Sequence, residues 1–80
     1  MEKTEITNKL TSIFKKVFDD NALVLSNELT ANDVDNWNSL SHMMLITEIE
    51  NLFSIKFRLK DLNKMRNVGE MIDIISLKLT

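Results

Sequence analysis

The segment that decides the fold is WNSLSHMMLITEIENLF, which runs from Trp37 to Phe53. Successive residues of an α-helix turn by about 100°, so apolar residues spaced three and four apart gather on one side. That side of the segment holds His42, Leu45, Ile46, Ile49, Leu52 and Phe53. The spacing predicts a helix that begins near Asn38 or Ser39, ends near Phe53 and turns this side toward a hydrophobic core.

The opposite side of the same helix is also rich in apolar residues. A helix that is apolar nearly all round is normally buried all round, but an 80-residue chain has too few other elements to cover it. We therefore expect Leu40 and Met43 to be exposed, while for Met44 exposure and packing under the preceding loop are both open. Exposed apolar patches mark partner sites. The predicted partner-binding residues are Leu40, Met43, Met44, Thr47, Glu48 and Asn51.

The residues before this segment predict one helix and one long loop. Residues 4–18 read as an amphipathic helix with Thr4 as its N-cap. Its apolar stripe is Ile6, Leu10, Ile13, Phe14, Val17 and Phe18. Residues 19–38 are rich in Asn, Asp, Ser and Thr, which favour turns and loops over helices. The residues expected to anchor this loop across the helices are Leu23, Val24, Leu25, Leu29, Val34 and Trp37.

The residues after the segment predict two more helices. A short helical piece is expected near residues 59–64, and a longer helix from Val68 to Leu79. Asn67 as N-cap with Glu70 three residues on resembles a capping box. The sequence therefore predicts an all-α, four-helix bundle with a long first loop and a short third helix. Residues 1–80 are expected to form a single domain.

The composition excludes several kinds of chemistry. The chain has no Cys, no Pro, one Gly and one His, so disulfides, zinc–thiolate sites, a cysteine nucleophile and a His-rich metal site are all excluded. A net charge of −2 gives no general attraction to nucleic acid or to anionic membranes. The longest apolar run, Met43 to Ile46, is too short for membrane insertion. We expect a cytoplasmic monomer.

The central segment resembles the second helix of acyl carrier proteins. These proteins have a Ser–Leu pair at the helix start, here Ser39 and Leu40, and an aliphatic and acidic pattern that closes on Phe, here Phe53 fourteen residues after Ser39. The stretch 55–57 and the stretch 65–72 resemble the segments that follow in that family. The resemblance covers essentially the whole chain.

The resemblance implies a four-helix bundle of the acyl-carrier type, without catalytic activity of its own. It implies that a holo-acyl-carrier-protein synthase attaches 4′-phosphopantetheine from coenzyme A to Ser39, flanked by Asn38 and Leu40. The arm would carry an acyl or aminoacyl group as a thioester. The implied partners are acyl ligases, ketosynthases or acyltransferases of a biosynthetic pathway.

Two features depart from the family pattern. Asn38 replaces the usual Asp, which in the family is thought to help hold the metal of the modifying enzyme, and Asp33 or Asp35 are candidates to substitute for it. The charge is uneven: residues 1–38 carry −3 (4 Lys, 7 acids), residues 39–55 carry −2, and residues 56–80 carry +3 (6 Lys or Arg, 3 acids). Fatty-acid carriers are strongly acidic along the second helix. The departure favours a dedicated pathway of specialised biosynthesis.

Four alternatives remain at the level of sequence. Ser39 and His42 lie at i and i+3 and could belong to a hydrolase, but no G-x-S-x-G motif is present. The basic stretch from Lys56 to Arg66 could bind nucleic acid, although charge runs are usually solvated surface. Because of Asn38, an unmodified, carrier-like interaction subunit is the best alternative to a working carrier. A peptidyl or D-alanyl carrier is a further one.

Overall fold

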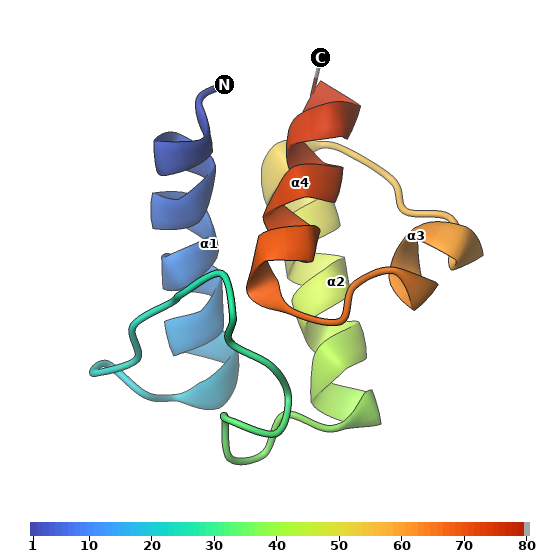
Figure 1. Cartoon of the computed structure of the whole chain (residues 1–80). Coiled ribbons are helices and arrows are strands. Elements are labelled where there is room, and N and C mark those ends of the chain that lie inside the picture. The colour runs from blue at the N-terminus through green and yellow to red at the C-terminus, as the bar shows by residue number, and fades with distance from the viewer. Residues whose placement is uncertain (80) are drawn as a thin grey trace.

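The computed structural model describes residues 1–79 and contains four helices and, over that range, no strand. They are α1 (Lys3–Phe18), α2 (Ser39–Phe53), α3 (Leu59–Asn63) and α4 (Val68–Leu79). Helix α1 packs against α2 and α4, while α3 projects to one side of these three (Figure 1). The predicted all-helical bundle with a long first loop and a short third helix is confirmed. Within this range no helix is long and apolar enough to cross a membrane.

The helix ends agree with the sequence except at the start of α1. The predicted cap Thr4 lies inside the helix, and the N-cap is Glu2, whose side chain makes no capping hydrogen bond. The Asn67 carboxamide does cap α4, accepting from the Glu70 backbone N–H at 2.8 Å. The Glu70 carboxylate pairs with Arg66 at 3.1 Å.

The core lies between α1, α2 and α4 and is built from the predicted stripes. Fully buried side chains come from all three helices: Ile6, Leu10, Phe14, Leu45, Ile49, Val68, Met71 and Ile75. One prediction for α2 is wrong, because Leu52 is 48% exposed. Leu52 lies at the edge of the apolar side, where the few elements of this small bundle leave it uncovered.

The loop of residues 19–38 is anchored at two places. The carbonyl oxygens of Leu29 and Asn27 accept from the backbone N–H groups of Val68 and Gly69, at 3.0 and 2.9 Å, so the loop supplies partners to the first turn of α4. Val34 and Trp37 are buried in the core, and Leu23, Leu25 and Leu29 pack partly against it. Val24 does not anchor the loop, since it is 79% exposed.

Candidate functional site

The first turn of α2 holds two serines, Ser39 and Ser41, whose hydroxyl groups differ in their hydrogen bonds. Asn38 caps the helix, with its Oδ1 accepting from the backbone N–H of Leu40 and of Ser41 at 3.0 Å each. The Ser41 hydroxyl accepts from the Asn38 N–H at 2.8 Å and donates to the Asn36 carbonyl at 2.6 Å. The exposed Ser39 hydroxyl has no hydrogen-bond partner among residues 1–79. Of the two hydroxyls, only that of Ser39 is free to react.

A hollow of about 570 Å³ opens beside Ser39. It lies between the loop, the first turns of α2, the end of α3 and the segment that follows α3. Its lining is Ala31, Trp37, Asn38, Ser39, His42, Met43, Leu62, Asn63, Met65 and Arg66. Because its exposed surface is mainly apolar, although only half of these residues are, the hollow suits an extended organic chain that leaves from the Ser39 oxygen.

His42 and Trp37 form one wall of this hollow. The Trp37 Nε1–H donates to His42 Nδ1 at 3.0 Å, and the two rings lie edge to edge and nearly coplanar, with centroids 6.1 Å apart and planes 15° apart. The Trp37 ring also meets Phe14 edge-on at 5.2 Å, which ties the wall to the core. Burial lowers the pKa of the His42 imidazole, so the neutral ring dominates near neutral pH.

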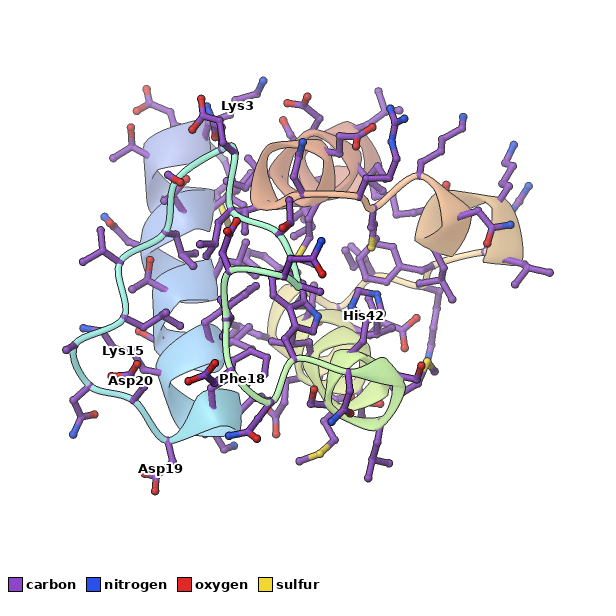
Figure 2. The ribbon with its side chains drawn as sticks, turned by 60° about the horizontal axis from the view of Figure 1, so that its bottom comes forward. Lys3, Lys15, Phe18, Asp19, Asp20 and His42 are labelled. Carbon is purple, nitrogen blue, oxygen red and sulfur yellow. The ribbon has the colours of Figure 1, made fainter. Side chains whose placement is uncertain are left out.

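The geometry does not assemble a hydrolase. The His42 Nδ1 accepts from the Trp37 Nε1–H, and no hydrogen bond joins His42 to Ser39 in the described range. The carboxylate of Asp33 is used in a turn, accepting from the Thr30 N–H at 3.0 Å. Asp33 and Asp35 line a different, acidic hollow together with Asp19 and Asp20. Figure 2 shows Asp19 and Asp20 at the end of α1, apart from His42 on α2.

The side of α2 that faces away from the core is exposed. Leu40 is 74%, Met43 52% and Met44 49% exposed. Met44, for which the sequence allowed either exposure or packing under the loop, is therefore exposed. Thr47 and Asn51 are exposed as well, and Glu48 is half-buried. A second apolar hollow of about 350 Å³ lies along this side. Its lining is Lys16, Val17, Leu40, Met43, Met44, Thr47 and Glu48.

Both acidic side chains of α2, Glu48 and Glu50, pair with groups elsewhere in the same chain. Glu48 pairs with Lys16 of α1 at 3.1 Å. The Glu50 carboxylate accepts from the backbone N–H of Phe57 at 2.8 Å, which holds the turn after α2. The exposed side of α2 therefore presents methyl and thioether groups rather than unpaired carboxylates.

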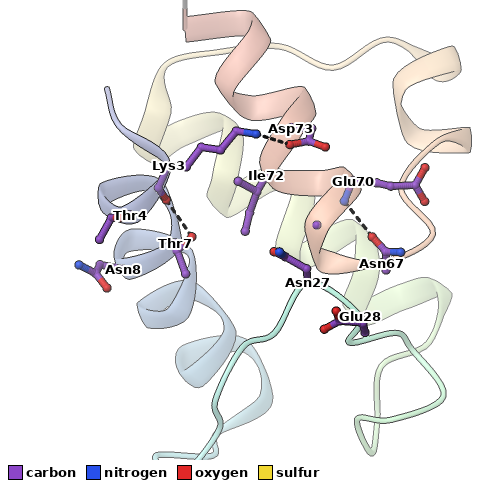
Figure 3. Close-up of a pocket in the computed structure, with 11 residues that line it drawn as sticks. Lys3, Thr4, Thr7, Asn8, Asn27, Glu28, Asn67, Glu70, Ile72 and Asp73 are labelled. Carbon is purple, nitrogen blue, oxygen red and sulfur yellow. Dashed lines mark hydrogen bonds and ion pairs between the residues drawn. The ribbon is translucent and has the colours of Figure 1, made fainter.

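A third hollow, of about 590 Å³, lies between α1 and the start of α4, away from these residues (Figure 3). Lys3 reaches across it to Asp73 at 2.8 Å, and Asn27 of the loop lines it. Its lining is largely polar, and none of the site residues predicted from the sequence belongs to it.

The fold of the chain has a counterpart in a solved structure. The holo acyl carrier protein from Geobacter metallireducens, determined by solution NMR, is 49% identical to this chain. The match covers 91% of this chain and 84% of that one, with a TM-score of 0.87. This chain belongs to the acyl carrier protein family. Acyl carrier proteins are carriers without catalytic activity of their own. No family model matches the chain, and no curated protein matches it.

One contact in the lining of the hollow beside Ser39 was not predicted from the sequence, the hydrogen bond between Trp37 and His42. A buried indole N–H usually finds an acceptor. That rule would have pointed to a polar side chain one turn into α2, and His42 is the titratable residue there.

Proposed function

We propose that the carrier holds an acyl or aminoacyl group as a thioester on a 4′-phosphopantetheine arm attached to Ser39. The observation that carries the proposal is the free Ser39 hydroxyl, beside two neighbours, Asn38 and Ser41, whose side chains are committed to the helix cap. The apolar hollow next to Ser39 gives the arm a surface to lie on. The residues present therefore fit the prosthetic group.

The proposed attachment is a phosphoryl transfer from coenzyme A, catalysed by a holo-acyl-carrier-protein synthase with Mg²⁺. A bond forms between Ser39 Oγ and the phosphorus next to pantetheine, and the bond from that phosphorus to the bridging oxygen breaks. Adenosine 3′,5′-bisphosphate leaves with that oxygen, and the serine proton passes to a base of the synthase. Ser39 needs only to be accessible and at a fixed position, and the helix cap provides that position.

Asn38 is the residue that could weaken this attachment. Its oxygen already accepts two backbone N–H groups, so the metal of the synthase meets an amide without negative charge. Asp33 and Asp35 line another hollow, which argues against their replacing it. We infer that attachment to this carrier is slower than attachment to a carrier with Asp at this position. Asn38 is also the one residue that favours the second candidate function, an unmodified interaction subunit.

We further propose that partner enzymes dock on Leu40, Met43, Met44, Thr47, Glu48 and Asn51. The apolar hollow between this side of α2 and α1 supports the proposal. Because Glu48 and Glu50 have internal partners, a basic patch on a fatty-acid enzyme would find little to pair with. A dedicated pathway with its own ligases and acyltransferases fits this surface better. We take residues 1–80 as one monomeric carrier domain.

Intact mass spectrometry tests the attachment. The carrier is incubated with coenzyme A, Mg²⁺ and a broad-specificity holo-synthase, and we expect one mass gain of a single arm. Ser39→Ala should abolish the gain, whereas the matched control Ser41→Ala should keep it while lowering thermal stability. The absence of a gain in the unaltered chain would favour the unmodified subunit, and a gain that survives Ser39→Ala would place the arm elsewhere.

Acyl transfer by a partner enzyme tests the docking surface. Met43→Glu places a charge on an exposed apolar position, so we expect transfer to slow at least tenfold while helicity is kept. Val24→Glu is the control, because Val24 is also exposed but lies in the loop. Equal rates for the two variants would remove Met43 from the surface.

A further inference from the structure

The bond between Trp37 and His42 determines which nitrogen of the imidazole carries the proton. The indole Nε1–H is only a donor, so His42 Nδ1, at 3.0 Å, must be the unprotonated acceptor. In the neutral ring the proton therefore lies on Nε2. The lowered pKa of His42 keeps this form dominant near neutral pH.

The Nε2–H group of His42 is open to a ligand. No buried side-chain nitrogen or oxygen in the described residues lacks a hydrogen-bond partner, and Nε2 makes no such bond, so Nε2 reaches solvent. His42 lines the same hollow as Ser39. The only other titratable side chain in that lining is Arg66, whose guanidinium pairs with Glu70 at 3.1 and 3.2 Å.

We propose that His42 positions the base of the arm by donating its Nε2–H to a phosphate oxygen of the phosphodiester at Ser39. This inference rests on the proposed attachment at Ser39. Residues at i and i+3 are neighbours on a helix surface, so the phosphodiester and the imidazole lie within mutual reach. A hydrogen bond to an anionic oxygen is stronger than one between neutral groups.

The donor is also fixed before the arm arrives. The His42 ring is held by the hydrogen bond from Trp37, and the Trp37 ring packs edge-on against Phe14, so little side-chain freedom is lost when the bond forms. As a consequence the first atoms of the arm are directed along the apolar hollow toward Leu62 and Met65. Trp37 acts through His42 by setting its tautomer.

NMR of the apo and holo carrier, with ¹⁵N-labelled histidine, tests the proposal. At pH 7.5 attachment of the arm should shift the Nε2 resonance of His42 and leave Nδ1 nearly unchanged. The pKa of His42 should be higher in the holo than in the apo form, because the phosphodiester anion favours the imidazolium. The Arg66–Glu70 pair is common to both forms, so its effect cancels. The ³¹P resonance of the arm should titrate with the same midpoint as His42.

Two variants separate positioning from folding. His42→Phe keeps an aromatic ring but removes both nitrogens, so the pH titration of the ³¹P resonance should vanish. His42→Gln retains an amide donor, so at pH 7.5 its ³¹P resonance should lie between those of His42→Phe and the unaltered holo carrier. If His42→Phe does not fold, the apo and holo comparison of the unaltered chain decides alone. A normal mass gain with identical His42 resonances in both forms would overturn this inference only. No mass gain would overturn the attachment at Ser39 and this inference with it.

Discussion

Replacing Trp37 with phenylalanine should weaken the anchor of the whole 19–38 loop. Trp37 is only 8% exposed and packs edge-on against Phe14. Phenylalanine keeps the six-membered ring but deletes the N–H that donates to His42, a loss of about 1 kcal/mol. It also removes about two buried carbon groups, at about 0.8 kcal/mol each. We expect Trp37→Phe to lower the free energy of unfolding by about 2.5 kcal/mol.

Urea and thermal unfolding followed by circular dichroism at 222 nm measure this loss. For a domain of this size 2.5 kcal/mol corresponds to a fall in Tm of roughly 10 to 20 °C. Val24→Ala is the matched control, since Val24 lies in the same loop but is 79% exposed, and it should change stability by less than about 0.5 kcal/mol. If Trp37→Phe changed stability no more than this control, the indole would not be the anchor of the loop.

Three further predictions concern the cap, the loop contact and pH. Asn38→Asp should keep the cap, add about 0.3 to 1 kcal/mol of stability in urea unfolding, and raise the rate of arm attachment measured by mass. In Gly69→Ala the added Cβ would meet the Asn27 carbonyl oxygen at 3.1 Å, so the gain of about 1 kcal/mol in helix propensity should not appear in thermal unfolding. The His42 pKa is lower in the folded than in the unfolded chain. The contribution of His42 to the free energy of unfolding is therefore fully present above the unfolded pKa near 6.5, and it is lost as the pH falls through the folded pKa. His42→Gln should flatten that part of the pH profile.

The helices could be predicted because their signals are local. The stripe that includes Ile6, Leu10 and Phe14 repeats with the helical period, and the structure buries it. The loop was harder, since burial there depends on which helix passes nearby rather than on spacing. Val24 and Leu25 are adjacent apolar residues, yet Leu25 packs against the core and Val24 does not. No property of either residue alone distinguishes them.

The candidate site likewise has one feature that the sequence predicts and one that only the structure shows. Ser39 is singled out by the resemblance to acyl carrier proteins, through the Ser39–Leu40 pair, because a serine at a helix start is by itself ordinary capping chemistry. Ser39 and Ser41 are both serines in the first turn of α2. Only the geometry shows that the Ser41 hydroxyl is held at 2.8 and 2.6 Å by the backbone of residues 36–38. The free serine hydroxyl is distinguished by the hydrogen bonds that the side chains of its neighbours make.

The internal pairing of the α2 acids bears on how the proposed partners recognise this carrier. The Lys16–Glu48 pair is largely solvent-exposed, and such a pair contributes about 0 to 1 kcal/mol. A basic partner could therefore separate this pair at little cost, but it would gain only the one carboxylate of Glu48, so repulsion is not what would exclude general fatty-acid enzymes. What they lack here is attraction, because electrostatic complementarity mainly accelerates encounter. On the proposed docking surface, affinity would then come from burying Leu40, Met43 and Met44, and the partner that we propose has a complementary apolar groove.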